Sequence, residues 1–144
     1  MWDSTRATAE SLQVEYTNIE PSDTYSLPIL KKLNALHDAL REYGCGTGIE
    51  ICGERVVVSD AGQECIFRPS SRGSWPCRII TRVFGDKCVV IAVMCILILL
   101  WKEGVITNIS INGSDLAQDD SMLGGENKTL WETAWSIMLN MKEV

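Results

Sequence analysis

Apolar residues recur at helical spacing near the start of the chain, over residues 26–44. They fall on one stripe of a helix: Ile29, Leu33, Leu36 and Leu40. Ser26 stands where an N-cap is expected, Pro28 is tolerated in a first helical turn, and Gly44 provides a C-terminal stop. The pattern predicts an amphipathic helix, whose stripe either packs on the rest of the domain or binds a partner.

A second amphipathic helix is expected near the C-terminal end. Thr129 and Glu132 have the T-x-x-E spacing of a capping box, in which two side chains satisfy backbone amides of the first turn. The apolar residues around and after this box share one face: Trp131, Ala134, Trp135 and Met138. Residues 105–144 are thus expected to form a polar stretch followed by one helix.

Between residues 46 and 85 the pattern changes to short runs rich in β-branched residues. The runs are Ile49–Cys52, Arg55–Val58, Glu64–Phe67 and residues 77–84. Short turn-favouring segments, such as Gly-Glu and Asp-Ala-Gly, separate these runs. With the preceding helix, these runs predict a small α+β unit over residues 26–87. Residues 1–25 are polar and acidic, which predicts a flexible tail.

The sharpest feature of the chain is the uninterrupted apolar run CVVIAVMCILILLW, residues 88–101. It contains no charged, amide or hydroxyl side chain, whereas a core helix of a small domain normally has one wet side. At about 1.5 Å per residue, the run is shorter than a hydrocarbon core of roughly 30 Å. We expect Lys87, Trp101 and Lys102 to act as membrane anchors, which would extend the effective length of the apolar run at the interface. We therefore expect a transmembrane helix over residues 88–104, with a buried core helix as the alternative.

Charges and sequons predict how this span is oriented. Most basic residues near the run precede it: Arg68, Arg72, Arg78, Arg82 and Lys87, against Lys102 after it. The positive-inside rule then places the N-terminal part in the cytoplasm, at the endoplasmic reticulum, Golgi or plasma membrane. The sequons all follow the run, and Asn108 is too close to the bilayer to be used. Asn112 and especially Asn127 are the expected glycosylation sites.

A tyrosine in the expected tail adds a signalling interpretation. Val14, Tyr16 and Ile19 have the spacing of, and resemble, the inhibitory tyrosine motif of immune receptors. The resemblance implies that phosphorylated Tyr16 would bind the Arg-centred pocket of an SH2 domain, with Ile19 as an apolar plug. Asn18 matches the preference of some SH2 adaptors. Residues 16–19 also resemble a sorting signal read by clathrin adaptors, and an ordinary tail tyrosine is the alternative.

The remaining candidate chemistry indicates no catalytic site. Four cysteines lack the close C-x2-C pairs of zinc sites, although they could form two disulfides in the reverse orientation: Cys45, Cys52, Cys65 and Cys77. His37 is the only histidine and has no paired Ser or Cys motif. The formal net charge of −6 argues against nucleic acid as a partner. We expect no enzymatic activity, no metal and no cofactor.

These patterns together predict a single-pass type II membrane glycoprotein that acts as a signalling, trafficking or regulatory subunit through its cytoplasmic part. Its partners would be membrane lipid, SH2 or clathrin-adaptor proteins, and further copies that pair through the transmembrane segment. The expected fold is a small cytoplasmic α+β unit, one transmembrane helix and a C-terminal amphipathic helix. The alternative is a soluble intracellular protein–protein interaction domain, mostly helical, with residues 88–101 as its buried core helix.

Overall fold

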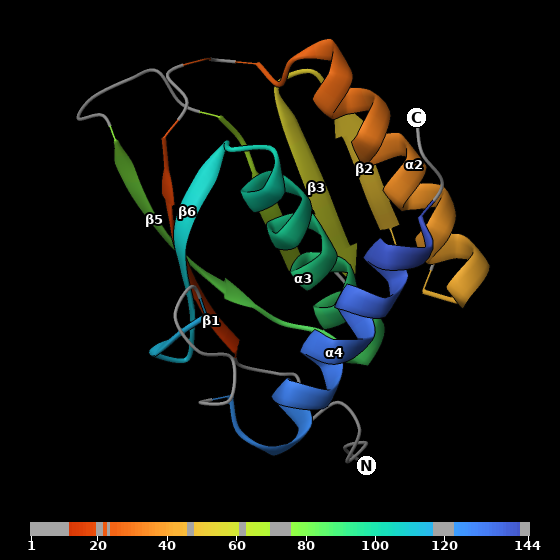
Figure 1. The fold of residues 1–144 in the computed structure, drawn as a ribbon, viewed down its shortest axis with the longest axis vertical. Helices are drawn as coiled ribbons and strands as arrows, with labels where there is room; N and C mark the ends of the chain where they lie inside the picture. Colours follow the sequence, from red (N-terminus) through yellow and green to blue (C-terminus); the bar gives the residue numbers. More distant parts are fainter. Residues whose placement is uncertain are drawn as a thin grey trace.

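The structure is a computed structural model, and it describes residues 12–19, 22, 24–45, 48–60, 63–69, 76–116 and 123–141. The helices are α2 (Leu27–Tyr43), α3 (Lys87–Lys102) and α4 (Gly125–Asn140). The strands are β1 (Leu12–Asn18), β2 (Gly48–Cys52), β3 (Arg55–Asp60), β4 (Gln63–Phe67), β5 (Cys77–Val83), β6 (Ile106–Ile111) and β7 (Ser114–Asp115). Figure 1 shows an α+β arrangement in which the helices pack beside and between the strands.

The strands form two antiparallel sheets. One has four strands in the order β5-β1-β6-β7, and the other has three in the order β2-β3-β4. In the larger sheet β1 is flanked on both sides, with Tyr16 opposite Ile79 of β5 and Val14 opposite Ile111 of β6. The rings of Tyr16 and Phe67 stack with their centroids 5.9 Å apart. This contact joins β1 to β4, so the two sheets meet side by side.

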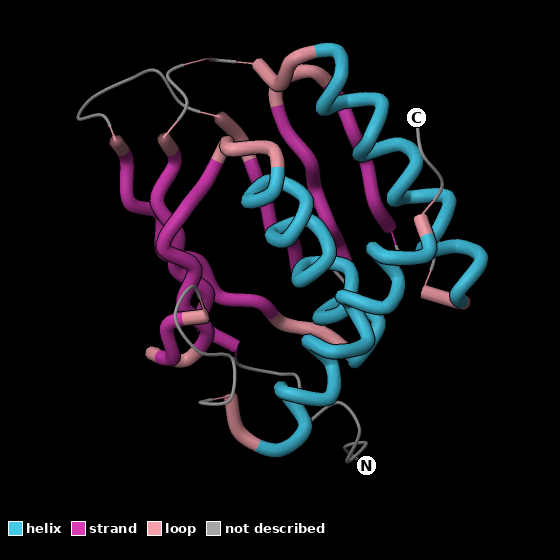
Figure 2. The backbone as a smooth tube through the Cα atoms, viewed as in Figure 1, coloured by secondary structure: helices cyan, strands magenta, loops and turns pink. Residues whose placement is uncertain are grey.

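Helix α3 occupies the centre of the molecule, and every residue from Val89 to Leu100 is buried. In Figures 1 and 2 it lies between the larger sheet on one side and α2 and α4 on the other, and it also contacts β3. The Asp86 carboxylate caps its start by accepting a hydrogen bond from the Val89 N–H at 3.1 Å. Because protein surrounds α3 on all sides, an apolar sequence around its whole circumference is what the packing requires.

The predicted transmembrane span is therefore wrong. Within the ranges that the structure describes, no helix is long and apolar enough to cross a bilayer. The fold class, the signal-anchor and type II topology, and the membrane localisation that rested on the span are overturned with it. The surface of residues 89–100, through which the run was expected to meet lipid or further copies, is covered by the chain's own elements. The alternative anticipated a buried central helix but not the two sheets around it.

The three residues expected as membrane anchors instead connect α3 with α4. Lys87 Nζ lies 2.9 Å from Glu126 Oε1, which pairs the first turns of the two helices. The ring of Trp101 meets that of Trp135 edge-on, with centroids 6.3 Å apart and an interplanar angle of 83°. Lys102 Nζ lies 6.0 Å from the centroid of the Trp135 ring. Both ends of α3 are thus fixed by contacts within the protein.

Strand β1 lies inside the segment that was expected to be a flexible tail, residues 1–25. Its alternate residues are buried: Leu12, Val14, Tyr16 and Asn18. The intervening residues are only partly covered, which gives the period of two expected for a strand with one face on a core. The expected tail does not hold for these residues, because hydrogen bonding to β5 and β6 on both sides incorporates them into the larger sheet.

Several other elements agree with the sequence pattern. The four β-prone runs form β2 to β5. Helix α2 begins after Ser26, whose side chain makes no capping bond, and it ends at Gly44 with a left-handed φ of 101°.

Helix α4 begins at Gly125, so Thr129 of the expected capping box lies inside the helix. There its carbonyl accepts a bond from the Thr133 hydroxyl at 3.0 Å. Strand β6 was not expected.

Candidate functional site

Three tryptophans from α3 and α4 form a cluster that we call the tryptophan platform: Trp101, Trp131 and Trp135. Trp131 and Trp135 are one helical turn apart on α4, and their rings meet edge-on with centroids 6.4 Å apart. Trp101, at the end of α3, packs in the same manner on Trp135. Edge-to-face contacts of this kind are favourable for aromatic rings. They hold the three indoles in fixed relative positions.

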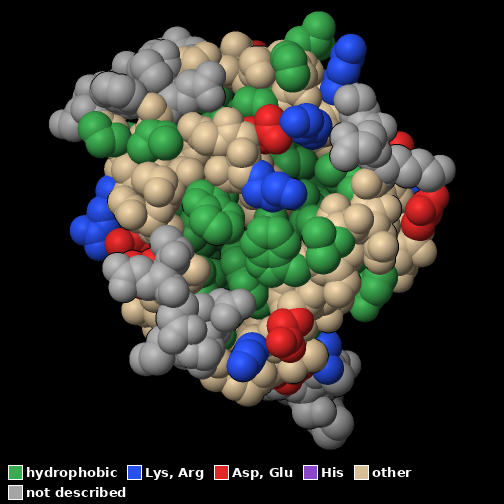
Figure 3. All heavy atoms as spheres, viewed as in Figure 1, with side chains coloured by type: hydrophobic (Ala, Val, Ile, Leu, Met, Phe, Trp, Pro, Cys, Tyr) green, Lys and Arg blue, Asp and Glu red, His purple; other side chains and the backbone are tan. Residues whose placement is uncertain are grey.

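The tryptophan platform reaches the molecular surface. Trp131 is buried, Trp135 is half-buried, and Trp101 is 36% exposed. Figure 3 is viewed from the same side as Figure 1, and it shows hydrophobic side chains gathered near the centre of that face, in the region between β6 and α4. Trp101 and Trp135 are therefore placed to contact another molecule, while Trp131 supports them from below.

Basic side chains border the tryptophan platform. Lys102 lies over the Trp135 ring, a cation–π arrangement, and it makes no ion pair with any residue that the structure describes. Nearby, Lys32 of α2 pairs with Glu103 through Nζ and Oε2 at 2.8 Å. That pair neutralises Glu103, the acidic neighbour of Lys102 in sequence. Within the described part of the chain, the positive charge of Lys102 therefore has no acidic partner and lies beside the exposed indoles.

The space beneath the tryptophan platform is too small for a ligand. Trp101, Trp131, Ile109 and Leu116 enclose about 10 Å³. Pockets for small molecules usually measure roughly 300–1,000 Å³, and even one water needs about 10–15 Å³. The platform is therefore a surface suited to contact, not a cavity suited to a substrate or cofactor.

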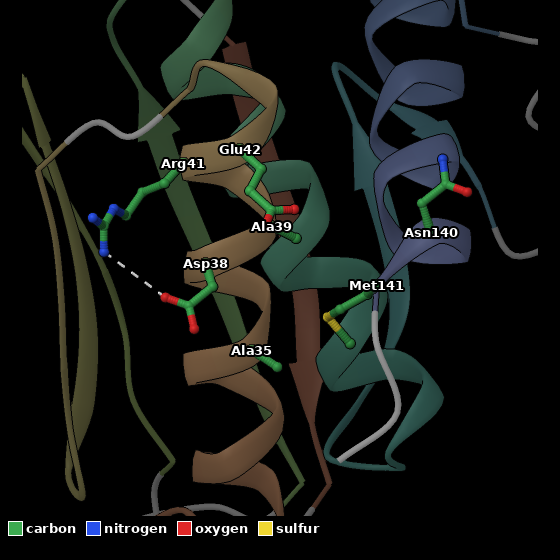
Figure 4. A pocket seen from close by; sticks show the side chains of 7 residues that line it. All are labelled: Ala35, Asp38, Ala39, Arg41, Glu42, Asn140 and Met141. Carbon is green, nitrogen blue, oxygen red and sulfur yellow. Dashed lines mark ion pairs between the residues drawn. The ribbon is translucent and has the colours of Figure 1, made fainter.

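A larger cleft lies between α2 and the end of α4. Its volume is about 520 Å³, and Figure 4 shows the side chains that line it: Ala35, Asp38, Ala39, Arg41, Glu42, Asn140 and Met141. Asp38 and Arg41 form a loose ion pair, with Oδ1 and Nη1 3.9 Å apart. Among the described residues that line the cleft there is no thiol, hydroxyl or imidazole, and the ionisable side chains are Asp38, Arg41 and Glu42. The cleft has the size of a small-molecule binding site.

Two buried thiols, those of Cys65 and Cys95, are candidates for reactive groups, but their environments make them poor nucleophiles. Burial raises the pKa of the Cys65 thiol to about 11 and, together with the nearby Cys45, that of Cys95 to about 12. A thiol with a raised pKa is a poor nucleophile at neutral pH. Among the described residues no three metal-ligating side chains stand close enough together to hold an ion.

The structure places the tyrosine motif inside the core. Tyr16 is 3% exposed, and Val14 and Asn18 are also buried in β1. Burial raises the pKa of the Tyr16 hydroxyl well above its ordinary value. Ile19 follows the strand, and its N–H donates to the Val105 carbonyl at 2.9 Å. The motif is thus part of the sheet, and recognition by an SH2 domain or a clathrin adaptor stays a prediction that requires β1 to leave it.

The predicted glycosylation sites lie at two separate places. Asn112 occupies the turn between β6 and β7, where its side-chain oxygen accepts a hydrogen bond from the Gln13 N–H at 2.9 Å. Asn127 lies half-buried in the first turn of α4. Their use as glycan acceptors stays a prediction.

The sequence pattern does not predict the tryptophan platform. In the sequence, Trp101 stands at the end of the apolar run as an expected interfacial anchor, and Trp131 and Trp135 lie on one face of the expected C-terminal helix. The available signal was the high tryptophan content, five in 144 residues. In comparisons of the chain with protein-family models, with curated proteins and with solved structures, nothing matches. A functional proposal therefore has to rest on the chain's own surface.

Proposed function

We propose that this chain is a non-catalytic protein-binding domain whose contact surface is the tryptophan platform. The observation that carries the proposal is the exposed indole of Trp101 next to the half-buried Trp135 and to Lys102, which makes no ion pair with the described residues. Tryptophan supplies large contact area with few rotatable bonds, and tryptophans and arginines dominate binding hot spots. Because the indoles are already held by edge-on packing, little side-chain entropy is lost on binding.

The partner that best fits this surface is a peptide segment with a large apolar side chain next to a carboxylate. The apolar side chain would lie on the indoles of Trp101 and Trp135, and the carboxylate would pair with Lys102. Indoles and a lysine can also stack and neutralise single-stranded nucleic acid. The formal net charge of −6 opposes that alternative, since nucleic-acid-binding domains are generally basic.

Selection from a random peptide library, with the full chain as bait, tests this proposal. We expect enriched peptides to share an aromatic or large aliphatic residue within a few positions of Asp or Glu. Trp101→Ala and Lys102→Glu should each weaken binding of an enriched peptide about tenfold or more, as hot-spot substitutions do. Binding is measured by fluorescence anisotropy, and circular dichroism verifies that each variant is folded.

Two matched variants serve as controls. Leu139→Ala removes a large apolar side chain that is 75% exposed on the same helix, α4, but outside the platform. Lys31→Glu reverses a charge on the exposed side of α2. Both should bind the peptide as tightly as the unmodified chain. Enriched peptides that bind Trp101→Ala and Lys102→Glu undiminished would place the binding surface elsewhere, and enrichment of no motif would contradict the proposal.

A further inference from the structure

Two of the six cysteines, Cys45 and Cys88, lie close together where the end of α2 meets the start of α3. The Cys88 thiol donates a weak hydrogen bond to the Gly44 carbonyl, with Sγ and O 3.8 Å apart. The next residue in the chain is Cys45, so the Cys88 sulfur lies beside the Gly44–Cys45 peptide bond. All six cysteines are unpaired in this structure. Cys45, just beyond the end of α2, and Cys88, in the first turn of α3, are therefore neighbouring reduced cysteines.

The backbone holds both cysteines in place. Gly44 takes the left-handed conformation that ends α2, and the Cys45 N–H donates to the Leu40 carbonyl at 2.8 Å. On the other side, the Asp86 cap orders the first turn of α3, which contains Cys88. A disulfide needs its sulfurs about 2.0 Å apart, and with the Cys88 sulfur 3.8 Å from the Gly44 carbonyl oxygen, rotation of the two side chains has to supply the approach.

We propose that Cys45 and Cys88 are a modification site at which an intramolecular disulfide forms by exchange with a low-molecular-weight disulfide such as oxidised glutathione. The bond would tie the end of α2 to the start of α3 and close the loop that contains β2 to β5. Cross-linking a long loop restricts the unfolded chain and stabilises the folded one.

The exchange proceeds in two balanced steps. Cys88 is half-buried whereas Cys45 is 3% exposed, so the Cys88 thiolate attacks one sulfur of oxidised glutathione first. One glutathione leaves as a thiolate, which takes up a proton, and a mixed disulfide remains on Cys88. Cys45 then loses its proton and attacks the Cys88 sulfur, and the second glutathione leaves. Overall, two protein thiols are oxidised, one disulfide is reduced, and both thiol protons end on glutathione.

The order of these steps agrees with the environment of Cys45. Burial, with a further contribution from the adjacent Cys88, raises the pKa of the Cys45 thiol to about 12, so it is the poorer first nucleophile. Cys95 is the other thiol near Cys45. It is fully buried, and its Sγ lies 3.6 Å from the Ala134 carbonyl oxygen, to which it donates. Cys88 is thus the accessible partner of Cys45.

To test this proposal, the full chain is equilibrated with mixtures of oxidised and reduced glutathione. The remaining thiols are then alkylated, and the chain is digested. A Cys52→Ser background removes the exposed thiol that would otherwise cross-link separate molecules. Disulfide formation itself should lower the mass of the chain by about 2 Da. The digest should contain a pair of peptides joined through Cys45 and Cys88. The urea midpoint of the oxidised chain should rise, and dithiothreitol should return it to the reduced value.

Cys88→Ser is the decisive variant, because it removes the half-buried partner without emptying the core. It should lose both the joined peptides and the oxidation-dependent rise of the urea midpoint. Cys77→Ser, also at a half-buried thiol, is the matched control and should keep both. Joined peptides that pair Cys45 with Cys95, or a chain that acquires only glutathione adducts at high oxidised glutathione, would overturn the proposal.

Discussion

Gln13 and Asn112 are joined by two hydrogen bonds at the end of the β1–β6 pair. The Gln13 N–H donates to the Asn112 side-chain oxygen at 2.9 Å, and the Asn112 N–H donates to the Gln13 carbonyl at 2.8 Å. Asn112 has a φ of 50°, a left-handed conformation that asparagine tolerates better than most residues. Asn112 therefore both forms the turn into β7 and holds the end of β6 against β1.

Asn112→Ala should lower the free energy of unfolding by about 1–2 kcal/mol, because alanine disfavours the left-handed conformation and cannot accept the Gln13 N–H. Asn112→Gly keeps the conformational freedom and loses only the side-chain bond, so it should cost less. Urea unfolding monitored by tryptophan fluorescence measures both values. Equal costs for the two variants would mean that the left-handed conformation contributes nothing to the loss.

Met94 lies at the middle of α3 and has no exposed surface, so its substitutions report on the central core. Met94→Ala should cost about 2–5 kcal/mol through lost packing and a residual cavity. Met94→Leu conserves volume and should cost less than about 1.5 kcal/mol. Met94→Lys should prevent folding, because a charge at this position has no partner. Thermal unfolding by circular dichroism ranks the three variants, and tolerance of lysine would contradict a buried central helix.

The parts of the fold that can be predicted from the sequence are those that depend on local contacts. Helix α2 and strands β2 to β5 were predictable, because capping, turn residues and short β-branched runs are local signals. The run at residues 88–101 could be identified as helical in either interpretation. Whether lipid or protein covers it depends on strands and helices far away in sequence, which the run itself does not encode.

Strand β1 and the tryptophan platform show the same limit in different ways. The alternation of Leu12, Val14 and Tyr16 was visible, but the acidic residues around it suggested a tail. The tryptophan platform has no local signal, since Trp101 and Trp135 come together only when α4 packs against α3. Surfaces assembled from distant segments require the fold before they can be recognised.

Tyrosine accessibility gives a prediction that separates folded from unfolded chains. Tyr16 is 3% exposed and stacked on Phe67, whereas Tyr43 at the end of α2 is 55% exposed. A promiscuous tyrosine kinase should therefore phosphorylate Tyr43 in the native chain and leave Tyr16 unmodified. Phosphopeptide mapping before and after unfolding in urea, with the denaturant diluted for the kinase reaction, checks this. Efficient labelling of Tyr16 in the native chain would indicate that β1 detaches readily from the sheet.

Alkaline pH should destabilise the folded chain through its buried thiols and phenols. Burial raises the pKa of Cys65 to about 11 and of Cys95 to about 12, and it also raises the pKa values of Tyr16 and Tyr25. In the unfolded chain a thiol titrates near 8.5. Since the pKa is higher in the folded state, the stabilisation is complete below about pH 8 and is lost as the pH rises towards 11 or 12.

The loss can be assigned to one thiol by comparing two pH values under reducing conditions. Between pH 7.5 and 10.5, each buried thiol that ionises only on unfolding should remove about 2 kcal/mol from the free energy of unfolding. Cys65→Ala has no such thiol in β4, so it should lose about 2 kcal/mol less than the unmodified chain over the same interval. It starts from a lower stability at pH 7.5, because removing the sulfur leaves a small cavity. Urea midpoints at the two pH values provide the four measurements required. If both chains lose the same amount, Cys65 ionises equally in the folded and unfolded states, and its burial has no influence on the alkaline transition.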